Sequence, residues 1–456
     1  MIKERITLAL CLTFLSAGIS HGEDWPQWFG TKRDGVWRES GLLERFPKEG
    51  ARVLWRQPIG GGYAGPAVAN GKVFVTDRVL NAGQKEPDNP FQRSKSQGKE
   101  RVLCFDARTG KELWKHEYPC KYTFSYSCGP RATPTIDGGK VYAFGGMGDL
   151  LCLEEETGKL LWSKNFVKEY DAAVQVWGFS ASPLIDGDRL ICLCGKKPAV
   201  VAFDKNTGKE LWRSLELESA EIGYCPPMIF TFGGQRQLLV WHPEAVVGLD
   251  LATGKPLWTH EWPVKANLTI STPRQIGKRL FLTSFYNGCR MLQIDKEGDQ
   301  FQVKELWRSN GRGEQPKQTD KLHSIMSTPI IQGEHIYGVC SYGELRCLNL
   351  SDGKRIWSDL KATGAGDAPE RWANAFLVPQ GDRVFLFNEK GDLIIARLSP
   401  KGYEELDRAH LLDPTGQLAA GFSSPRKVVW SHPAFANKAV FARNDKEIVA
   451  VSVAAE

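Results

Sequence analysis

The sequence predicts an all-β fold, an eight-bladed β-propeller with four-stranded antiparallel blades whose ring is closed by the N-terminal strand. Three observations support it. A turn that ends in Gly-Lys and leads to a tryptophan recurs along the chain, small residues recur where inner strands are expected, and the last repeat lacks an outer strand of its own. With 46 glycines and 25 prolines in 456 residues, the chain is rich in turn-forming residues.

The recurring turn sets the length of the repeat. Its clearest copy occupies residues 157–162, TGKLLW in one-letter code. Equivalent tryptophans follow one another at intervals of about 50 residues, which is typical of a propeller blade. These tryptophans are Trp55, Trp114, Trp162, Trp212, Trp258, Trp307 and Trp357, and Leu406 stands where an eighth would fall.

Each residue type in the turn has a structural reason. In the copy that begins at Asp204, the carboxylate can accept hydrogen bonds from the amides of its own turn. Gly208 supplies the positive φ that a tight hairpin needs. Trp212 then offers a large flat face, which we expect to be buried between neighbouring blades.

The inner strands can be counted from the proline that leads each of them. These are Pro66, Pro134, Pro183, Pro227, Pro273, Pro329 and Pro433, with Leu377 in the same place in the seventh repeat. Trp55 precedes the first of these strands, whereas no tryptophan strand follows the last. We therefore predict that the strand containing Trp55 completes the blade that begins near Pro433, which removes two exposed sheet edges.

A column of small residues lies two positions before the prolines. Because eight inner strands converge on one axis, we expect only small side chains to fit there, and a seven-bladed ring would leave one member unexplained. The column consists of Ala64, Ala132, Ala181, Cys225, Ser271, Ser327, Ala375 and Ser431.

Residues 1–22 predict a signal peptide, and residues 23–456 a single propeller domain. A basic start at Lys3 and Arg5 precedes a short apolar run, and small residues at positions 20 and 22 fit cleavage before Glu23. We therefore expect a periplasmic or secreted protein. No later apolar run reaches the roughly 18 residues of a membrane helix, so we expect no membrane span.

Charge and cysteine content narrow the classes of function. The net charge is +6, from 59 basic and 53 acidic residues, without the basic stripe of a nucleic-acid-binding protein. The cysteines show no zinc-binding spacing, so we expect no metal site. An exported chain meets oxidising conditions, and we expect a disulfide between Cys120 and Cys128, which lie in one loop.

The Asp-x-x-Thr-Gly-Lys-x-x-Trp repeats resemble the PQQ-like repeat family, over about residues 25–453. That family includes quinoprotein dehydrogenases and the propeller subunit of the outer-membrane barrel-assembly machinery. The segment DWPQWFG at residues 24–30 resembles the start of secreted propellers of planctomycete-type bacteria. The resemblance implies the fold, but one scaffold hosts many functions.

The dehydrogenases of this family imply PQQ with calcium, a disulfide of adjacent cysteines on one face of the quinone and an aspartate as base. This sequence has no adjacent cysteines, and Leu193 separates Cys192 from Cys194, which we interpret as one face of a buried strand. We therefore expect no cofactor and identify no catalytic residue. The alternative is a divergent quinoprotein oxidoreductase that uses PQQ and calcium on an alcohol or a sugar.

The loops that connect successive blades predict a ligand site at one mouth of the channel. The column three positions before the prolines mixes aromatic, basic and polar residues, whereas the column two positions before them holds only small residues. Aromatic faces with Arg, His and Asn suit a protein, a peptide or a carbohydrate; we expect a monomer. The predicted site comprises Tyr63, Arg131, Trp177, Tyr224, His323, Arg371, Trp372, Asn374, Trp430 and His432.

One polar insertion, Asn81 to Lys99, lies within the first repeat. It lacks any periodicity, so we expect a mobile, solvated loop between two strands.

Overall fold

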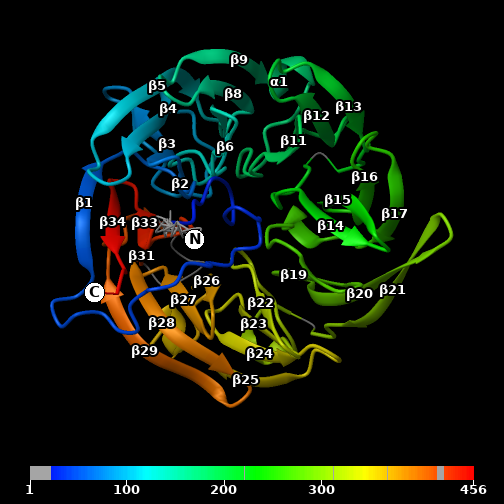
Figure 1. The fold of residues 1–456 in the computed structure, drawn as a ribbon. Coiled ribbons are helices and arrows are strands. Elements are labelled where there is room, and N and C mark those ends of the chain that lie inside the picture. The colour runs from blue at the N-terminus through cyan, green and yellow to red at the C-terminus, as the bar shows by residue number, and fades with distance from the viewer. Residues whose placement is uncertain (1–21, 220, 312, 367, 419–425, 456) are drawn as a thin grey trace, which may run out of the picture.

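A computed structural model describes residues 22–219, 221–311, 313–366, 368–418 and 426–455. The predicted signal peptide, apart from Gly22, lies outside the described residues. Eight four-stranded sheets stand around a common axis (Figure 1), which confirms the predicted propeller. No helix among the described residues is long and apolar enough to cross a membrane.

The blades follow the order of the chain. The first blade comprises β2 (Ala67–Ala69), β3 (Lys72–Leu80), β4 (Gln97–Asp106) and β5 (Glu112–Lys121), and the second comprises β6 (Thr135–Asp137), β7 (Lys140–Phe144), β8 (Asp149–Glu154) and β9 (Leu160–Asn165). The third blade comprises β10 (Leu184–Asp186), β11 (Arg189–Leu193), β12 (Val200–Asp204) and β13 (Glu210–Ser214), and the fourth comprises β14 (Met228–Phe232), β15 (Gln235–Trp241), β16 (Ala245–Asp250) and β17 (Pro256–Glu261). The fifth blade comprises β18 (Arg274–Ile276), β19 (Arg279–Ser284), β20 (Gly288–Glu297) and β21 (Gln300–Arg308), and the sixth comprises β22 (Ile330–Gln332), β23 (His335–Val339), β24 (Leu345–Asn349) and β25 (Arg355–Asp359). The seventh blade comprises β26 (Ala375–Gln380), β27 (Arg383–Asn388), β28 (Asp392–Ser399) and β29 (Gly402–His410).

The eighth blade joins the two ends of the chain. It comprises β32 (Ala434–Ala436), β33 (Ala439–Arg443), β34 (Glu447–Ser452) and, as its outer strand, β1 (Arg52–Pro58). β1 pairs antiparallel with β34, with Trp55 opposite Ala450. The predicted ring closure is therefore confirmed, and Figure 1 shows blue β1 beside red β34.

A few short elements lie between the blades. They are α1 (Phe166–Glu169), the 3-10 turns η1 (Lys265–Asn267), η2 (Pro316–Gln318) and η3 (Lys361–Thr363), and a hairpin of β30 (Gly416–Gln417) and β31 (Lys427–Val428).

Most of the repeat tryptophans lie between neighbouring blades, as predicted, and pack against the turn of the next blade. The indole N–H of Trp114 in β5 donates to the carbonyl of Glu155 in the following blade at 2.8 Å. A Cβ placed on Gly158 of that turn would lie 2.4 Å from the Trp114 ring. The same bond joins Trp55 to Ala107, Trp162 to Lys205, Trp307 to Leu350 and Trp357 to Ser399.

The seventh blade has Leu406 in place of the repeat tryptophan, and residues that precede β1 cover its outer strand. The carbonyl of Leu406 in β29 accepts from Nη1 of Arg45 at 2.8 Å, and the amide of Phe46 donates to the carboxylate of Asp407 at 2.7 Å. Residues just before β1 therefore pack on the outer strand of the seventh blade.

The column of small residues lies at the crowded axis. All eight members are at most 3% exposed. Their hydroxyls tie neighbouring blades together, because Ser271 Oγ donates to the Ser327 carbonyl at 2.9 Å and Ser327 Oγ to the Ala375 carbonyl at 2.8 Å.

The segment before β1 closes one end of the channel, which the repeat pattern did not predict. The buried guanidinium of Arg33 donates to the carbonyls of Pro183 at 2.9 Å and Pro227 at 3.2 Å. The indole of Trp28 donates to Thr272 Oγ1 at 3.2 Å. In Figure 1 this dark blue segment crosses the middle of the ring.

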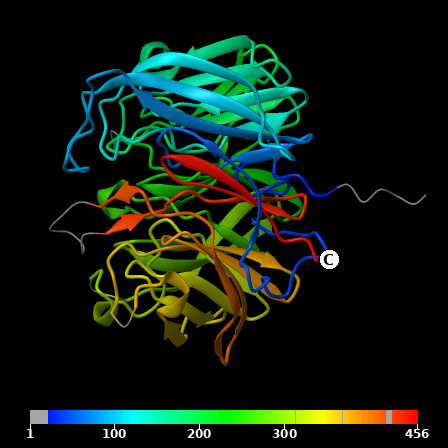
Figure 2. The same cartoon turned by 90° about the vertical axis from the view of Figure 1, so that its left-hand side faces the viewer.

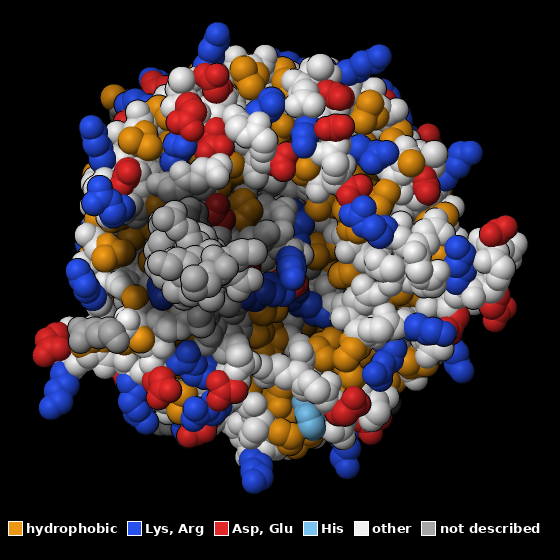
Figure 3. Space-filling view, in the orientation of Figure 1, with side chains coloured by type: hydrophobic (Ala, Val, Ile, Leu, Met, Phe, Trp, Pro, Cys, Tyr) orange, Lys and Arg blue, Asp and Glu red, His pale blue; other side chains and the backbone are white. Residues whose placement is uncertain are grey.

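The two faces of the ring differ. In Figure 2 the β3–β4 insertion and the β30–β31 hairpin project from the face opposite the N-terminal segment. Figure 3 looks onto the N-terminal side, where Lys and Arg side chains mix with Asp and Glu over the blades.

The expected disulfide between Cys120 and Cys128 is wrong, because both thiols are free. β5 continues to Lys121, so Cys120 lies in the sheet opposite Gly98. Cys128 instead packs against Gly61, where an added Cβ would lie 2.4 Å from its sulfur. The other eight described cysteines are buried and also free.

The contact between tryptophan and glycine predicts a difference between two substitutions. Gly158 and Gly139 have φ of +71° and +75°, but an added Cβ at Gly139 meets nothing within 4 Å. Both Gly158→Ala and Gly139→Ala carry the strain of positive φ. Only G158A also displaces Trp114, so its free energy of unfolding should fall by about 1–3 kcal/mol more. Urea unfolding of both variants measures this; equal losses would contradict the packing role.

Candidate ligand-binding site

A cavity of about 340 Å³ opens at the channel mouth on the face of the inter-blade loops. It gathers side chains from all eight blades, because each chain segment that leads into an inner strand reaches the rim there. Eight of the ten predicted site residues line it: Tyr63, Arg131, Trp177, Tyr224, Arg371, Trp372, Trp430 and His432.

The other two predicted residues do not line the cavity. His323 is 1% exposed, and its Nδ1 lies 3.2 Å from the carbonyl of Phe285, which does line it. Asn374 is 2% exposed, and its carbonyl accepts from the amide of Glu389 at 3.0 Å. Both belong to the wall behind the lining.

Sequence reasoning missed several aromatic residues of the lining. Phe376 lies two positions beyond the predicted column, along the same strand. Trp28 comes from the N-terminal segment and Phe91 from the insertion of the first repeat, and neither segment repeats. The missed aromatic residues are Trp28, Phe91, Tyr126, Phe285, Tyr286 and Phe376.

The floor of the cavity is formed where the N-terminal segment meets the eighth blade. The His432 ring lies 5.3 Å from that of Trp28 and 5.0 Å from those of Phe29 and Phe376. Nδ1 of His432 lies 2.7 Å from the Pro433 carbonyl. A carbonyl only accepts, so Nδ1 carries the proton. Nε2 has no partner within the described part of the chain, and in the neutral ring it is a free acceptor.

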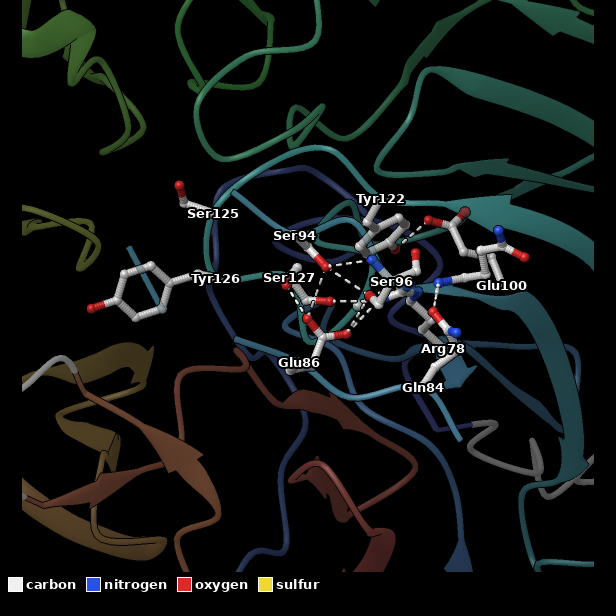
Figure 4. Close-up of polar contacts among 12 residues, drawn as sticks. Arg78, Gln84, Glu86, Ser94, Ser96, Glu100, Tyr122, Ser125, Tyr126 and Ser127 are labelled. Carbon is white, nitrogen blue, oxygen red and sulfur yellow. Dashed lines mark hydrogen bonds and ion pairs between the residues drawn. The ribbon is translucent and has the colours of Figure 1, made fainter. Parts of the chain in front are cut away.

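Part of the β3–β4 insertion forms one wall: Phe91 lines the cavity, whereas most of residues 81–93 are exposed, as expected of a solvated loop. Ser94 and Ser96 are 1% and 4% exposed. Figure 4 shows them around Glu86 together with Arg78 and Ser127. Glu86 accepts from Nη1 of Arg78 at 2.5 Å, from Ser96 Oγ at 3.1 Å and from Ser94 Oγ at 3.3 Å, and also from Ser127.

This cluster ties the insertion to the next loop of the channel mouth. Ser125 Oγ donates to the Phe91 carbonyl, and the Tyr126 amide to the Pro90 carbonyl, both at 2.6 Å. The rings of Phe91 and Tyr126 meet at 5.1 Å between centroids. The Glu86 cluster therefore positions two aromatic side chains of the lining.

Arg131 is the notable charge of the cavity. Its guanidinium lies 4.8 Å from the centre of the Tyr63 ring, and its nitrogens donate to the carbonyls of Gly129, Ser125 and Tyr126. Burial lowers the pKa of Arg131. An arginine side chain stays protonated in proteins, so its guanidinium carries a positive charge. Among the described residues no carboxylate lies within 4.0 Å of it to form a salt bridge.

Arg371 differs from Arg131 because a carboxylate neutralises its charge. It pairs with Glu314 at 2.7 Å and lies over the Trp372 ring at 4.6 Å. The cavity therefore holds one neutralised guanidinium and one that is held only by neutral groups.

The donor set of the cavity does not fit PQQ with calcium. Calcium takes six to eight oxygen ligands, chiefly carboxylates, and no described residue of the lining is Asp or Glu. The described residues contain no group of three His, Cys, Asp or Glu that could hold a metal ion. Cys192 and Cys194 lie instead in a buried apolar cluster around β11, where burial raises the pKa of both thiols.

The Glu86 cluster predicts the effect of its removal. Glu86→Ala leaves the buried guanidinium of Arg78 without its carboxylate, which should lower the free energy of unfolding by about 2–3 kcal/mol. It should also speed hydrogen exchange in residues 81–96. Asp88→Ala, an exposed acid of the same insertion, is the control and should change neither. Unchanged exchange in E86A would mean that the cluster does not order this wall.

Buried histidines predict a loss of stability in mild acid. Burial lowers the pKa of His432 and His323 to about 4, below the value of about 6.5 in the unfolded chain. As pH falls, the unfolded state is protonated first, so stability present above about pH 6.5 is lost towards pH 4, by up to about 3 kcal/mol per histidine. Denaturant unfolding at several pH values should show this loss.

A substitution can separate the contribution of His432 to this loss of stability in acid from that of the other histidines. His432→Gln should flatten the pH dependence, whereas His410→Gln, at an exposed position, should leave the slope between pH 6.5 and 4 in place. Equal slopes in the native protein and in H432Q would contradict a neutral, buried His432.

Comparison with known proteins agrees with this architecture. A family model described as outer membrane protein assembly factor BamB matches residues 98–359. Among solved structures, BamB from Moraxella catarrhalis is 14% identical, with a TM-score of 0.53, over 87% of this chain and 98% of that one. No curated protein matches the chain in sequence.

Enzymes share the fold as well. Quinohemoprotein alcohol dehydrogenase from Comamonas testosteroni is 14% identical, with a TM-score of 0.59, over 95% of this chain and 81% of that one. A europium-containing methanol dehydrogenase is 12% identical, with a TM-score of 0.60, over 94% and 89%. The family match covers more than half of the chain and the ring has eight blades, so the protein belongs to the PQQ-like propeller family.

Proposed function

We propose that this protein is an exported, noncatalytic binding propeller, a monomer whose ligand or partner segment occupies the cavity at the channel mouth. One observation carries the proposal. All eight blades contribute side chains to a single cavity that is rich in aromatic rings and closed below by Trp28 and His432. Concave, mostly apolar sites with a few polar groups are the usual form of a ligand site.

The shape favours binding from one side. Because the N-terminal segment crosses the channel and is held by Arg33, whatever enters the cavity comes from the face of the inter-blade loops. Aromatic faces such as those of Trp177 and Trp430 suit a sugar ring, an aromatic ring or a side chain of a peptide. The family description as an assembly factor favours a protein or peptide over a carbohydrate.

The oxidoreductase alternative has weaker support. Likeness to the dehydrogenases lies in the fold, and one fold hosts many functions. The lining of the cavity lacks the carboxylates that would hold calcium beside a quinone.

A double substitution tests the proposed face. Arg131→Ala with Trp372→Ala should weaken binding at least tenfold, because it removes a cation and an aromatic face from the lining but leaves the sheets in place. Ligands selected from a displayed peptide library and from a glycan array serve as probes. Lys111→Ala with Lys159→Ala, in turns between the outer strands, is the control and should bind normally.

Two results would contradict the proposal. Loss of binding in the lysine control, with R131A/W372A unaffected, would place the site on the other face. Reduction of a dye with simple alcohols or sugars, dependent on added PQQ and calcium, would show an enzyme.

A further inference from the structure

The wall of the cavity is divided into two chemically different halves. The loops that lead into the first four blades contribute Tyr63, Arg131, Ser180 and Tyr224. Three of these side chains carry hydroxyls and the fourth carries a charge; the rings of Tyr126 and Trp177 also lie in this half. The hydroxyls of Ser180 and Tyr224 donate within the wall, so the guanidinium of Arg131 is the group that this half offers to an anion.

The other half is mostly apolar, although His432 and Tyr286 also belong to it. The loops that lead into blades five to eight contribute Ile270, Met326, Trp372 and Trp430, and Phe285 lies beside them. The only described charge of this half, Arg371, is neutralised by Glu314 at 2.7 Å. An occupant therefore meets a cation on one side and, opposite it, a side made mainly of rings and aliphatic groups.

Arg131 lacks the counterion that a charge in such a place needs. Its nitrogens reach three backbone carbonyls and its face lies over Tyr63 and Phe124. Carbonyl dipoles and ring faces stabilise a cation only in part, and a desolvated charge without a partner is unfavourable.

One carboxylate beside this wall, that of Glu221, serves other groups. Glu221 accepts from the hydroxyl of Tyr224 at 3.1 Å and from the amide of Val176 at 2.9 Å. It forms no described salt bridge with Arg131. A ligand anion would therefore supply the first carboxylate, sulfate or phosphate oxygen that this guanidinium meets.

We infer that the cavity takes an amphiphilic anion, with its carboxylate, sulfate or phosphate group at Arg131 and its ring or alkyl body against the apolar half. The inference rests on the proposed function, since it names the class of ligand for that same cavity.

Three probes of one shape test the inference on the native, full-length protein. Isothermal titration calorimetry is carried out with 2-naphthoate, with the neutral 2-naphthalenemethanol and with the cationic 2-naphthylmethylammonium. A charge-assisted hydrogen bond to Arg131 should make the naphthoate bind about 10- to 100-fold more tightly than the alcohol. The cation should bind more weakly than the alcohol.

Substitution locates the preference. Arg131→Gln should bring the affinities for naphthoate and alcohol together, whereas Arg93→Gln, an exposed arginine of the β3–β4 insertion, should preserve the difference. If R131Q does not fold, the comparison of the three probes on the native protein decides the matter alone.

The outcomes separate this inference from the proposed function. An alcohol or amine that binds as tightly as naphthoate would overturn the anionic ligand and leave a neutral binding site standing. If none of the three binds at millimolar concentration, both the ligand class and the small-ligand form of the proposed function fail. A preference for naphthoate that R131Q retains would assign the anion to another residue and overturn the role of Arg131.

Discussion

Eight inner strands meet at one axis, and the space left between them limits every side chain that points there. The residues two positions before the leading prolines are all small and at most 3% exposed. Serines of that column bond across blade boundaries, as Ser271 does to the Ser327 carbonyl. With the axis fixed in this way, the residues one position earlier lie around the mouth, where space opens. The site is thus a direct result of the crowding beneath it.

The repeat pattern predicted the ring but not everything inside it. The tryptophan and glycine of each turn meet in space at a fixed interval in the sequence, so periodicity reveals their contact, as for Trp114 and Gly158. The column three positions before the leading prolines also recurs at a fixed interval, and seven of its eight residues line the cavity. Asn374 is the exception: it is buried behind the lining, where its carbonyl accepts from the amide of Glu389.

What the sequence could not predict comes from segments that occur once. Trp28 bonds Thr272, 244 residues away, and no period links the two. Phe91 belongs to an insertion whose polar composition predicted a solvated loop, yet Glu86 gathers three serines and Arg78 there. The expected disulfide between Cys120 and Cys128 was wrong because nearness in sequence does not determine which residues a strand or a loop brings next to a cysteine.

The pairing of β1 with β34 has a consequence for how the protein is made. Arg52 faces Ser452, so β1 meets its partner strand only after the seven intervening blades have been synthesised. Until then β1 has no partner, and the segment that closes the channel has no complete ring to lie on. Closure of the ring therefore depends on contacts of very high sequence separation, which are slow to form. A chain cut short before residue 447 retains seven blades' worth of sheet but has two open ends, each a template for unwanted strand pairing.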